Sequence, residues 1–177
     1  MLQGKNLNLI VAISENNVIG TREGKIPWQG LVPSDIARFV ELTSKPGSNS
    51  VVMGRTTWET IPGKFRPLSH RQNIVVSRNK TFFPDRDQVV VAHSLEEAVE
   101  KANCQTLWIL GGEQVYTEVL SRDLVDEMHI TKVHGRFIVE VEFPRVNSGH
   151  WVLTRDTLSN TLPDRICTSY QVYYRKQ

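Results

Sequence analysis

The sequence has few cysteines and no recognisable arrangement of metal-binding residues. Cys104 and Cys167 are the only two cysteines in 177 residues, and they do not form a CxxC pair. This scarcity indicates a reducing compartment and argues against redox or metal use of the cysteines. The histidines show neither HxH nor HExxH spacing, so no metal site is expected. They are His70, His93, His129, His134 and His150.

Strong net charge and long apolar runs are also missing. The formal net charge is +2, and no run of Lys or Arg occurs, so a nucleic-acid partner is not expected. The apolar run LNLIVAI at residues 7–13 is interrupted by Asn8. It is too short for a membrane span and lacks a signal-peptide layout, so we expect a cytoplasmic protein without a membrane partner. The length and the absence of repeats predict a single domain over residues 1–177.

What the sequence does contain is a series of apolar, β-branched runs, nearly continuous rather than alternating. Such runs are typical of strands that are covered on both faces. They lie at residues 7–13, 50–54, 73–77, 88–92 and 106–110, with helical patterns at 33–43, 55–61, 94–102 and 112–120. This alternation predicts an α/β sheet with right-handed crossovers. The later runs 127–133, 150–156 and 168–176 predict antiparallel strands, the last two joined by a loop around 160–165, so the sheet should be mixed.

One carboxylate stands at the border of an apolar helix face. The helix is expected to begin at Pro33, with Ile36, Phe39 and Val40 on one inward-turned face and Asp35 beside them. An acidic residue in a first turn is often a surface residue that interacts with the helix dipole. The residues alone leave open whether Asp35 does only this or faces a cavity.

The predicted carboxyl ends of the strands are rich in small, hydroxylic and arginine residues. Ligands of open α/β sheets bind at these ends. The segments are Gly54-Arg55-Thr56-Thr57, Ser77-Arg78-Asn79, His93-Ser94 and Gly111-Gly112. Arginines and helix starts would suit a phosphate, although no GxGxxG follows the first strand. The alternative is a set of ordinary turns with solvated arginines, and for Gly111-Gly112 a tight turn alone.

Seven motifs together resemble the dihydrofolate reductase family, in order and in approximate spacing, over about residues 7–175. They are VAISENNVIG, IPW, DIARF, VVMGRTTWETIP, RPLSHRQNIVVSR, LWILGGEQVY and VEVEFP. The resemblance implies an eight-stranded, mostly parallel mixed sheet with four flanking helices. It also implies an oxidoreductase that reduces 7,8-dihydrofolate to 5,6,7,8-tetrahydrofolate with NADPH as cofactor. Hydride would reach C6 and a proton N5, in support of one-carbon metabolism and thymidylate synthesis.

The resemblance further implies roles for individual residues. Asp35 would orient the pterin within a network that includes Thr131, and a water near Trp28 would deliver the proton. The implied substrate-binding residues are Ile10, Asp35, Ile36, Phe39, Ile61, Arg66, Leu68, Arg71, Leu110 and Thr131. The implied cofactor-binding residues are Ala12, Ile19, Gly20, Gly54, Arg55, Thr56, Thr57, Ser77, Arg78, His93, Gly111, Gly112, Glu113, Gln114, Val115 and Tyr116. Arg71 would bind the glutamate tail, a cis peptide would join Gly111 to Gly112, and residues 14–30 would form a lid.

The chain departs from the family pattern in the lid, in the connection before Asp35 and directly after Gly111-Gly112. Ile26 stands where bacterial relatives commonly have methionine, and Glu113 stands at the third position of a GGG version. Gly30 and Val32 are extra residues in the interval before Asp35. Such an insertion should lengthen the connection without changing the helix register, because Pro33 can still begin the helix.

The expected partners are dihydrofolate and antifolate inhibitors, and the chain is expected to be a monomer. One alternative is a reductase of the same fold that acts on a ribosylated pyrimidine in riboflavin synthesis. It would need neither a pterin-binding carboxylate at Asp35 nor a tail-binding Arg71. A second alternative is a non-catalytic nucleotide or folate carrier.

Overall fold

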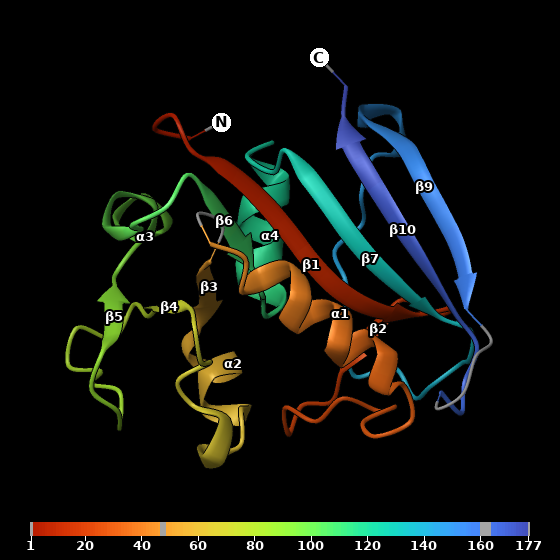
Figure 1. Cartoon of the computed structure of the whole chain (residues 1–177), viewed down its shortest axis with the longest axis horizontal. Helices are drawn as coiled ribbons and strands as arrows, with labels where there is room; N and C mark the ends of the chain where they lie inside the picture. Colours follow the sequence, from red (N-terminus) through yellow and green to blue (C-terminus); the bar gives the residue numbers. More distant parts are fainter. Residues whose placement is uncertain (1, 47–48, 160–163, 177) are drawn as a thin grey trace.

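A computed structural model describes residues 2–46, 49–159 and 164–176 (Figure 1). The strands are β1 (Asn6–Ser14), β2 (Val18–Gly20), β3 (Ser50–Gly54), β4 (Gln72–Val76), β5 (Val89–Ala92), β6 (Thr106–Ile109), β7 (Glu127–Val133), β8 (Val141–Glu142), β9 (Trp151–Ser159) and β10 (Thr168–Arg175). The helices are α1 (Pro33–Thr43), α2 (Arg55–Thr60), α3 (Leu95–Lys101) and α4 (Glu113–Ser121). Two short 3₁₀ turns cover Gly63–Phe65 and Ser148–His150.

Eight strands form one mixed sheet in the order β5-β4-β3-β6-β1-β7-β10-β9. The six strands from β5 to β7 pair in parallel, and β10 runs antiparallel to both β7 and β9. The predicted eight-stranded mixed sheet with four flanking helices is therefore confirmed, including an antiparallel edge from the C-terminal third. The predicted loop around 160–165 lies in part outside the described residues, because 160–163 are not among them.

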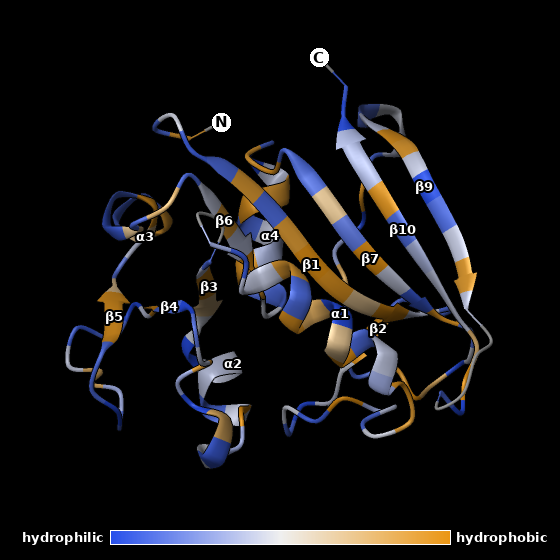
Figure 2. Ribbon diagram, viewed as in Figure 1, coloured by the Kyte–Doolittle hydropathy of each residue, from blue (hydrophilic) through white to orange (hydrophobic). Residues whose placement is uncertain are grey.

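Two apolar layers explain why the strand sequences are nearly continuous in hydrophobicity. Successive residues of a strand point to opposite faces, so a strand covered on both sides needs apolar residues at each position. In β3, Val51 and Met53 pack with Trp58 of α2, whereas Val52 packs in the cluster that includes α3 and α4. Figure 1 shows α1 in front of the sheet and α4 behind it, and Figure 2 shows hydrophobic residues along β1 between them.

Helix α1 begins at Pro33, as predicted, and the extra residues before it do not shift its register. Val32 provides no side-chain cap; instead the carboxylate of Asp164, from the segment before β10, accepts hydrogen bonds from both the backbone N–H and the hydroxyl of Ser34. The N–H bond is 3.0 Å long. A carboxylate at a helix start satisfies a free N–H group and opposes the helix dipole.

The prediction that Ile36, Phe39 and Val40 form one inward face is wrong for two of the three. Ile36 is 58% exposed and Val40 is 43% exposed, whereas Phe39 is partly buried and Thr43 is buried. At about 100° per residue, positions 35 and 39 share one stripe and positions 36 and 40 share the next one. Helix α1 rests on the sheet through the first stripe, so Ile36 and Val40 turn away from the sheet.

Residues 14–30, the predicted lid, are held against the segment 135–143. Strand β2 pairs with β8 to form a separate two-stranded sheet. The side-chain amide of Asn16 donates to the carbonyl of Phe137 at 2.7 Å, and that of Asn17 donates to the carbonyl of Phe143 at 2.6 Å. These contacts join the first part of the lid to the connection that follows β7.

Candidate active site

Asp35 and Thr131 meet where α1 crosses the sheet. Thr131 lies in β7, is buried, and hydrogen-bonds the Asp35 carboxylate through its hydroxyl. Burial raises the pKa of Asp35 above its ordinary value; the Thr131 hydrogen bond and the charge of Arg38 oppose this rise, and Asp164 adds to it. The stripe geometry of α1 thus places a desolvated carboxylate toward the sheet.

Apolar side chains from four segments border this carboxylate's side of the sheet. Ile10, Ile61, Leu68 and Leu110 are partly buried, and all four pack against one core cluster that contains Trp58 and Trp108. They come from β1, the residue that follows α2, the segment before β4 and the residue that follows β6. The structure therefore brings together four predicted substrate-wall residues that are distant in the sequence, and leaves their outer surfaces accessible.

The two arginines predicted near the substrate tail have different environments. Arg71 donates to the Thr43 hydroxyl at 2.8 Å, and its guanidinium carbon lies 5.3 Å from the ring centre of Phe39. Burial lowers the pKa of Arg71. Arg71 is thus held beside the C-terminal half of α1, where it contacts Phe39, which is on the same stripe of the helix as Asp35.

Arg66 is directed elsewhere. It forms an ion pair of 3.0 Å with Asp85 and lies 3.3 Å from the carbonyl oxygen of Trp58, to which it donates. Its side chain is only 16% exposed, and its Nε is buried without a hydrogen-bond partner within the described residues. These contacts make Arg66 a link between α2 and the 85–86 segment and leave Arg71 as the better-placed cation for a substrate tail.

Trp28, near the end of the predicted lid, is buried in an apolar cluster just before α1. It is 3% exposed and packs with Val32 and Val133, and its ring centre is 5.2 Å from that of Phe137. Ala12, predicted at the nicotinamide, packs against this same cluster. Val32, one of the two extra residues, is therefore part of the packing around Trp28 rather than a solvated loop residue.

Three glycines bring two strand ends into close contact. The Gly54 N–H donates to the Gly111 carbonyl at 2.7 Å, and the peptide bond between Gly111 and Gly112 is cis, as the resemblance implied. A Cβ on Gly54 would lie 3.3 Å from Val115, and one on Gly112 would lie 3.1 Å from the Thr57 hydroxyl. Gly111 has φ +94°, and a Cβ there would lie 2.6 Å from the Tyr116 ring, so a side chain at position 111 is excluded by geometry.

This glycine junction fits an anionic dinucleotide. Gly54 and Gly112 are the N-cap residues of helices α2 and α4, and among the described residues neither helix has a side-chain cap. Free N–H groups at helix starts favour phosphate. Ile19 and Gly20 end β2, and Thr56, Glu113 and Gln114 lie in the first turns of α2 and α4, so these predicted residues adjoin the same junction or the lid. The Tyr116 hydroxyl donates to the carbonyl of Ile10 at 2.8 Å.

The predicted phosphate arginines follow two neighbouring parallel strands. Arg55 follows β3 and forms an exposed ion pair of 2.9 Å with Glu59, whereas Arg78 follows β4 and donates to Gln114 at 3.2 Å. Ser77 is buried, and its carbonyl oxygen lies 2.9 Å from Nδ1 of His93. The register of β3 and β4 pairs Gly54 with Val76, so both arginines leave the sheet at the same edge.

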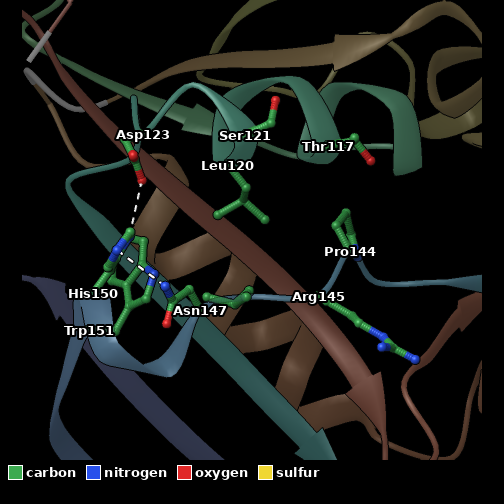
Figure 3. A pocket seen from close by; sticks show the side chains of 10 residues that line it. Thr117, Leu120, Ser121, Asp123, Pro144, Arg145, Asn147, His150 and Trp151 are labelled. Atoms are coloured by element: carbon green, nitrogen blue, oxygen red, sulfur yellow. Dashed lines mark hydrogen bonds and ion pairs between the residues drawn. The ribbon is translucent and has the colours of Figure 1, made fainter.

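A separate cavity of about 400 Å³ lies on the α4 side of the sheet (Figure 3). It lies between the second half of α4 and the segment 144–151, and among its lining residues Nδ1 of His150 is 3.6 Å from a carboxylate oxygen of Asp123. None of the predicted site residues lines it. Among residues 2–46, 49–159 and 164–176, no group of three or more His, Cys, Asp or Glu side chains could hold a metal ion. In the same ranges, no helix combines the length and apolar character that crossing a membrane requires.

Comparison with known proteins decides the family. A family model described as dihydrofolate reductase matches residues 6–175. The chain belongs to the dihydrofolate reductase family. A putative dihydrofolate reductase of Caenorhabditis elegans is 35% identical over 148 residues, which cover 77% of this chain and 76% of that protein. The dihydrofolate reductase of Heliothis virescens is 31% identical and is covered to 80%, as is this chain.

The structural neighbour gives the same result. Dihydrofolate reductase from Enterococcus faecalis, complexed with NADP(H) and RAB-propyl, has a TM-score of 0.82 and 29% identity, with 99% of both chains covered. A bifunctional dihydrofolate reductase-thymidylate synthase of Glycine max is 32% identical, and the chain spans only 29% of its length. The predictions of family, enzyme class and cofactor are confirmed by these matches, which are to dihydrofolate reductases and include a structural neighbour complexed with NADP(H).

Two charged residues near Asp35 were missed by sequence reasoning. Arg38 lies one helical turn after Asp35 on the same side of α1, and this i, i+3 spacing was an available signal. Asp164 approaches from the segment before β10, 130 positions away from Ser34, and no local pattern predicts that contact. Their opposite charges act on the same carboxylate.

Proposed function

We propose that the residues between α1 and the ends of β1, β6 and β7 bind the pterin of 7,8-dihydrofolate, and that Asp35 is the group that orients it. The observation that carries this proposal is the contact of Asp35 with Thr131 inside an apolar border. A desolvated carboxylate needs a charge-assisted partner. The amino group and ring N–H of a pterin offer two parallel donors to its two oxygens.

The other predicted substrate-binding residues would hold the rest of the substrate around Asp35 and Thr131. Ile10, Ile61, Leu68 and Leu110 supply an apolar border for the ring and the segment beyond it, with Phe39 on α1. Arg71 lies beside the C-terminal half of α1, whereas Asp35 is in the first turn of that helix. Arg71 is suited to the carboxylate of a glutamate tail, because a guanidinium forms bidentate pairs with carboxylates.

NADPH would supply the hydride, from C4 of its nicotinamide to C6 of the dihydropterin. The glycine junction at Gly54, Gly111 and Gly112 and the uncapped starts of α2 and α4 are the features that would hold its pyrophosphate. Arg55 and Arg78 would lie toward its 2′-phosphate.

The proton that N5 receives would depend on three features: the charge of Asp35, the position of Trp28 and closure of the lid. Asp35 contributes orientation and electrostatic stabilisation rather than direct transfer, and a water admitted beside Trp28 is the proton donor to N5. Closure of residues 14–30 would exclude bulk water from the proposed pterin site.

The experiment is NADPH oxidation with dihydrofolate by the parent chain and by Asp35→Asn. If the orienting charge stabilises the transition state by about 2–4 kcal/mol, its loss should decrease turnover by roughly 30- to 1,000-fold at pH 7. The affinity for NADPH should be retained. Glu41→Gln, which removes an exposed carboxylate from the same helix, is the matched control and should behave like the parent. Turnover of Asp35→Asn within about threefold of the parent would contradict the role of Asp35.

The same assay separates the alternatives. A reductase of ribosylated pyrimidines would oxidise NADPH with that substrate and not with dihydrofolate, and a carrier would bind ligands without oxidation. We further propose that the chain is a cytoplasmic, monomeric single domain over 1–177 that supports one-carbon metabolism and thymidylate synthesis. Diaminopyrimidine antifolates would bind through Asp35, since their amino-bearing edge offers the same paired donors.

A further inference from the structure

Arg38 connects the pterin-binding helix to the two strands beside it, and the roles proposed above do not use it. Its Nη1 donates to the Thr131 hydroxyl oxygen at 3.4 Å. Its guanidinium carbon lies 3.9 Å from the ring centre of Tyr170 in β10. The i, i+3 spacing also puts its charge within electrostatic reach of Asp35. From α1, Arg38 therefore contacts both β7, which carries Thr131, and β10, which carries Tyr170.

The contact with Thr131 sets the direction of a hydroxyl hydrogen. A threonine hydroxyl has one donor hydrogen and two acceptor lone pairs. A guanidinium can only donate, so it occupies an acceptor position of Thr131, and the Asp35 carboxylate can only accept. The hydroxyl hydrogen is thereby directed to Asp35, which stabilises the ionised carboxylate that the pterin needs.

Tyr170 is fixed from its other end. The Tyr170 hydroxyl hydrogen-bonds Nδ1 of His129, and Nε2 of His129 lies 2.6 Å from the carboxylate of Glu127. Because a carboxylate only accepts, Nε2 carries a hydrogen; in the neutral imidazole Nδ1 then accepts from the tyrosine hydroxyl. Burial raises the pKa of Tyr170 to about 12, so its hydroxyl keeps its hydrogen at neutral pH. The ring face is left for Arg38 to pack against, a favourable position for a cation.

Charges of both signs face Asp35. Arg38 lies on one side and Asp164, which caps the start of α1, acts from another. Tyr116 of α4 is buried with its pKa raised by burial and by the charge of Asp35. The further charged or titratable groups around Tyr170 are His129, Glu127, Glu41 and Arg155. Among the charged groups of the described residues, those that act on the Asp35 charge are the positive Arg38 and the negative Asp164.

We propose that Arg38 is a positioning residue for dihydrofolate reduction, which holds the Thr131 hydroxyl toward Asp35 and supplies the positive charge that faces this carboxylate. The inference rests on the proposed function of Asp35. The reaction consumes a proton, so its rate falls as the pH rises through the pKa of the group or bound substrate atom that takes part in protonation. A cation nearby lowers that pKa and an anion raises it.

The test is the pH profile of hydride transfer, from about pH 5.5 to 9, for Arg38→Met and Asp164→Asn. Arg38→Met should move the midpoint upward by about half a pH unit or more and raise the KM for dihydrofolate about threefold or more. Asp164→Asn keeps an acceptor for Ser34 and should move the midpoint downward. NADPH affinity should stay within about twofold of the parent in both, because neither residue approaches the glycine junction.

Conservative and distant variants separate positioning from a general loss of structure. Arg38→Lys keeps the charge and should retain a midpoint closer to the parent's. Arg38→Gln loses the charge but keeps an N–H donor; it replaces Arg38→Met if that variant is unfolded by circular dichroism. Arg145→Met removes a positive charge beside the cavity on the α4 side and should leave the profile unchanged.

Two results would overturn the inference: an unchanged profile and KM in the uncharged Arg38 variants, or shifts of the same sign in the Arg38 and Asp164 variants. A parent chain that does not oxidise NADPH with dihydrofolate would instead contradict the proposed function. The two failures are thereby distinguished in one set of measurements.

Discussion

Removal of the Asp35 charge should make the protein more stable at neutral pH while it slows the reaction. Burial raises the pKa of Asp35 above its ordinary 3.8, so the folded chain retains this proton to a higher pH than the unfolded chain. At pH values between the pKa of Asp35 in the unfolded chain and its pKa in the folded chain, the folded state binds more protons. The free energy of unfolding therefore falls as the pH rises through that window. Above the window, the full cost of burying the ionised carboxylate is present. Asp35→Asn removes this penalty.

The size of the gain follows from the groups around the carboxylate. Burial and Asp164 disfavour the charge, whereas the Thr131 hydrogen bond and Arg38 offset only part of that cost. A partly compensated buried polar group costs about 1 kcal/mol or somewhat more. For a chain of 177 residues this corresponds to a rise in Tm of about 2–4 °C at pH 7.

The assay is thermal unfolding by circular dichroism at a series of pH values between about 4 and 8, for the parent and Asp35→Asn. The stability advantage of the variant should be full at pH 7 and should shrink toward pH 4. Glu41→Gln, at an exposed position of the same helix, should show no comparable dependence. A Tm at pH 7 equal to or below the parent's, or an advantage that grows toward acid, would refute the argument.

Three further substitutions test the rest of the site. Arg71→Ala should raise the KM for dihydrofolate far more than it lowers kcat, because Arg71 is remote from the reacting atoms; a pterin substrate without the glutamate tail should show little difference between variant and parent. Alanine at both Arg55 and Arg78 should narrow the ratio of kcat/KM for NADPH over NADH, and an unchanged ratio would place the 2′-phosphate elsewhere. Val32→Ala should lower the free energy of unfolding by about 2 kcal/mol and Tm by about 4–8 °C, since Val32 is 4% exposed beside Trp28; a loss below about 0.5 kcal/mol would contradict that packing.

The parts of the fold predicted from the sequence are those with strong local signals. Strands Ser50–Gly54 and Glu127–Val133 and helix Pro33–Thr43 have the predicted bounds, because continuous β-branched runs and a proline start identify them locally. Strands β2 and β8 span only three and two residues, too few for a periodicity to be visible. Their pairing depends on the arrangement of the whole lid.

Within the candidate site, short motifs made Asp35 and the Gly111-Gly112 pair identifiable from the sequence. The structure gives Asp35 a hydrogen bond with Thr131 and joins the two glycines by a cis peptide bond. The helical period could not decide which of two adjacent stripes of α1 rests on the sheet, so Ile36 was assigned to the wrong one. For Arg66 the expectations were a place near the substrate tail or a solvated arginine; its ion pair with Asp85 depends on a tertiary contact that no local pattern shows.

The cap of α1 by Asp164 also bears on the order in which the ribosome makes the protein. Helix α1 is synthesised early, yet the carboxylate that satisfies its first turn is 130 residues further along the chain. The N–H of Arg165 also donates to the carbonyl of Leu31, so the same late segment fixes the entry to the helix. A nascent chain that has emerged from the ribosome only as far as β9 would carry Asp35 on a helix that still lacks its cap. Competence to bind a pterin therefore arises late in translation, when the segment before β10 emerges.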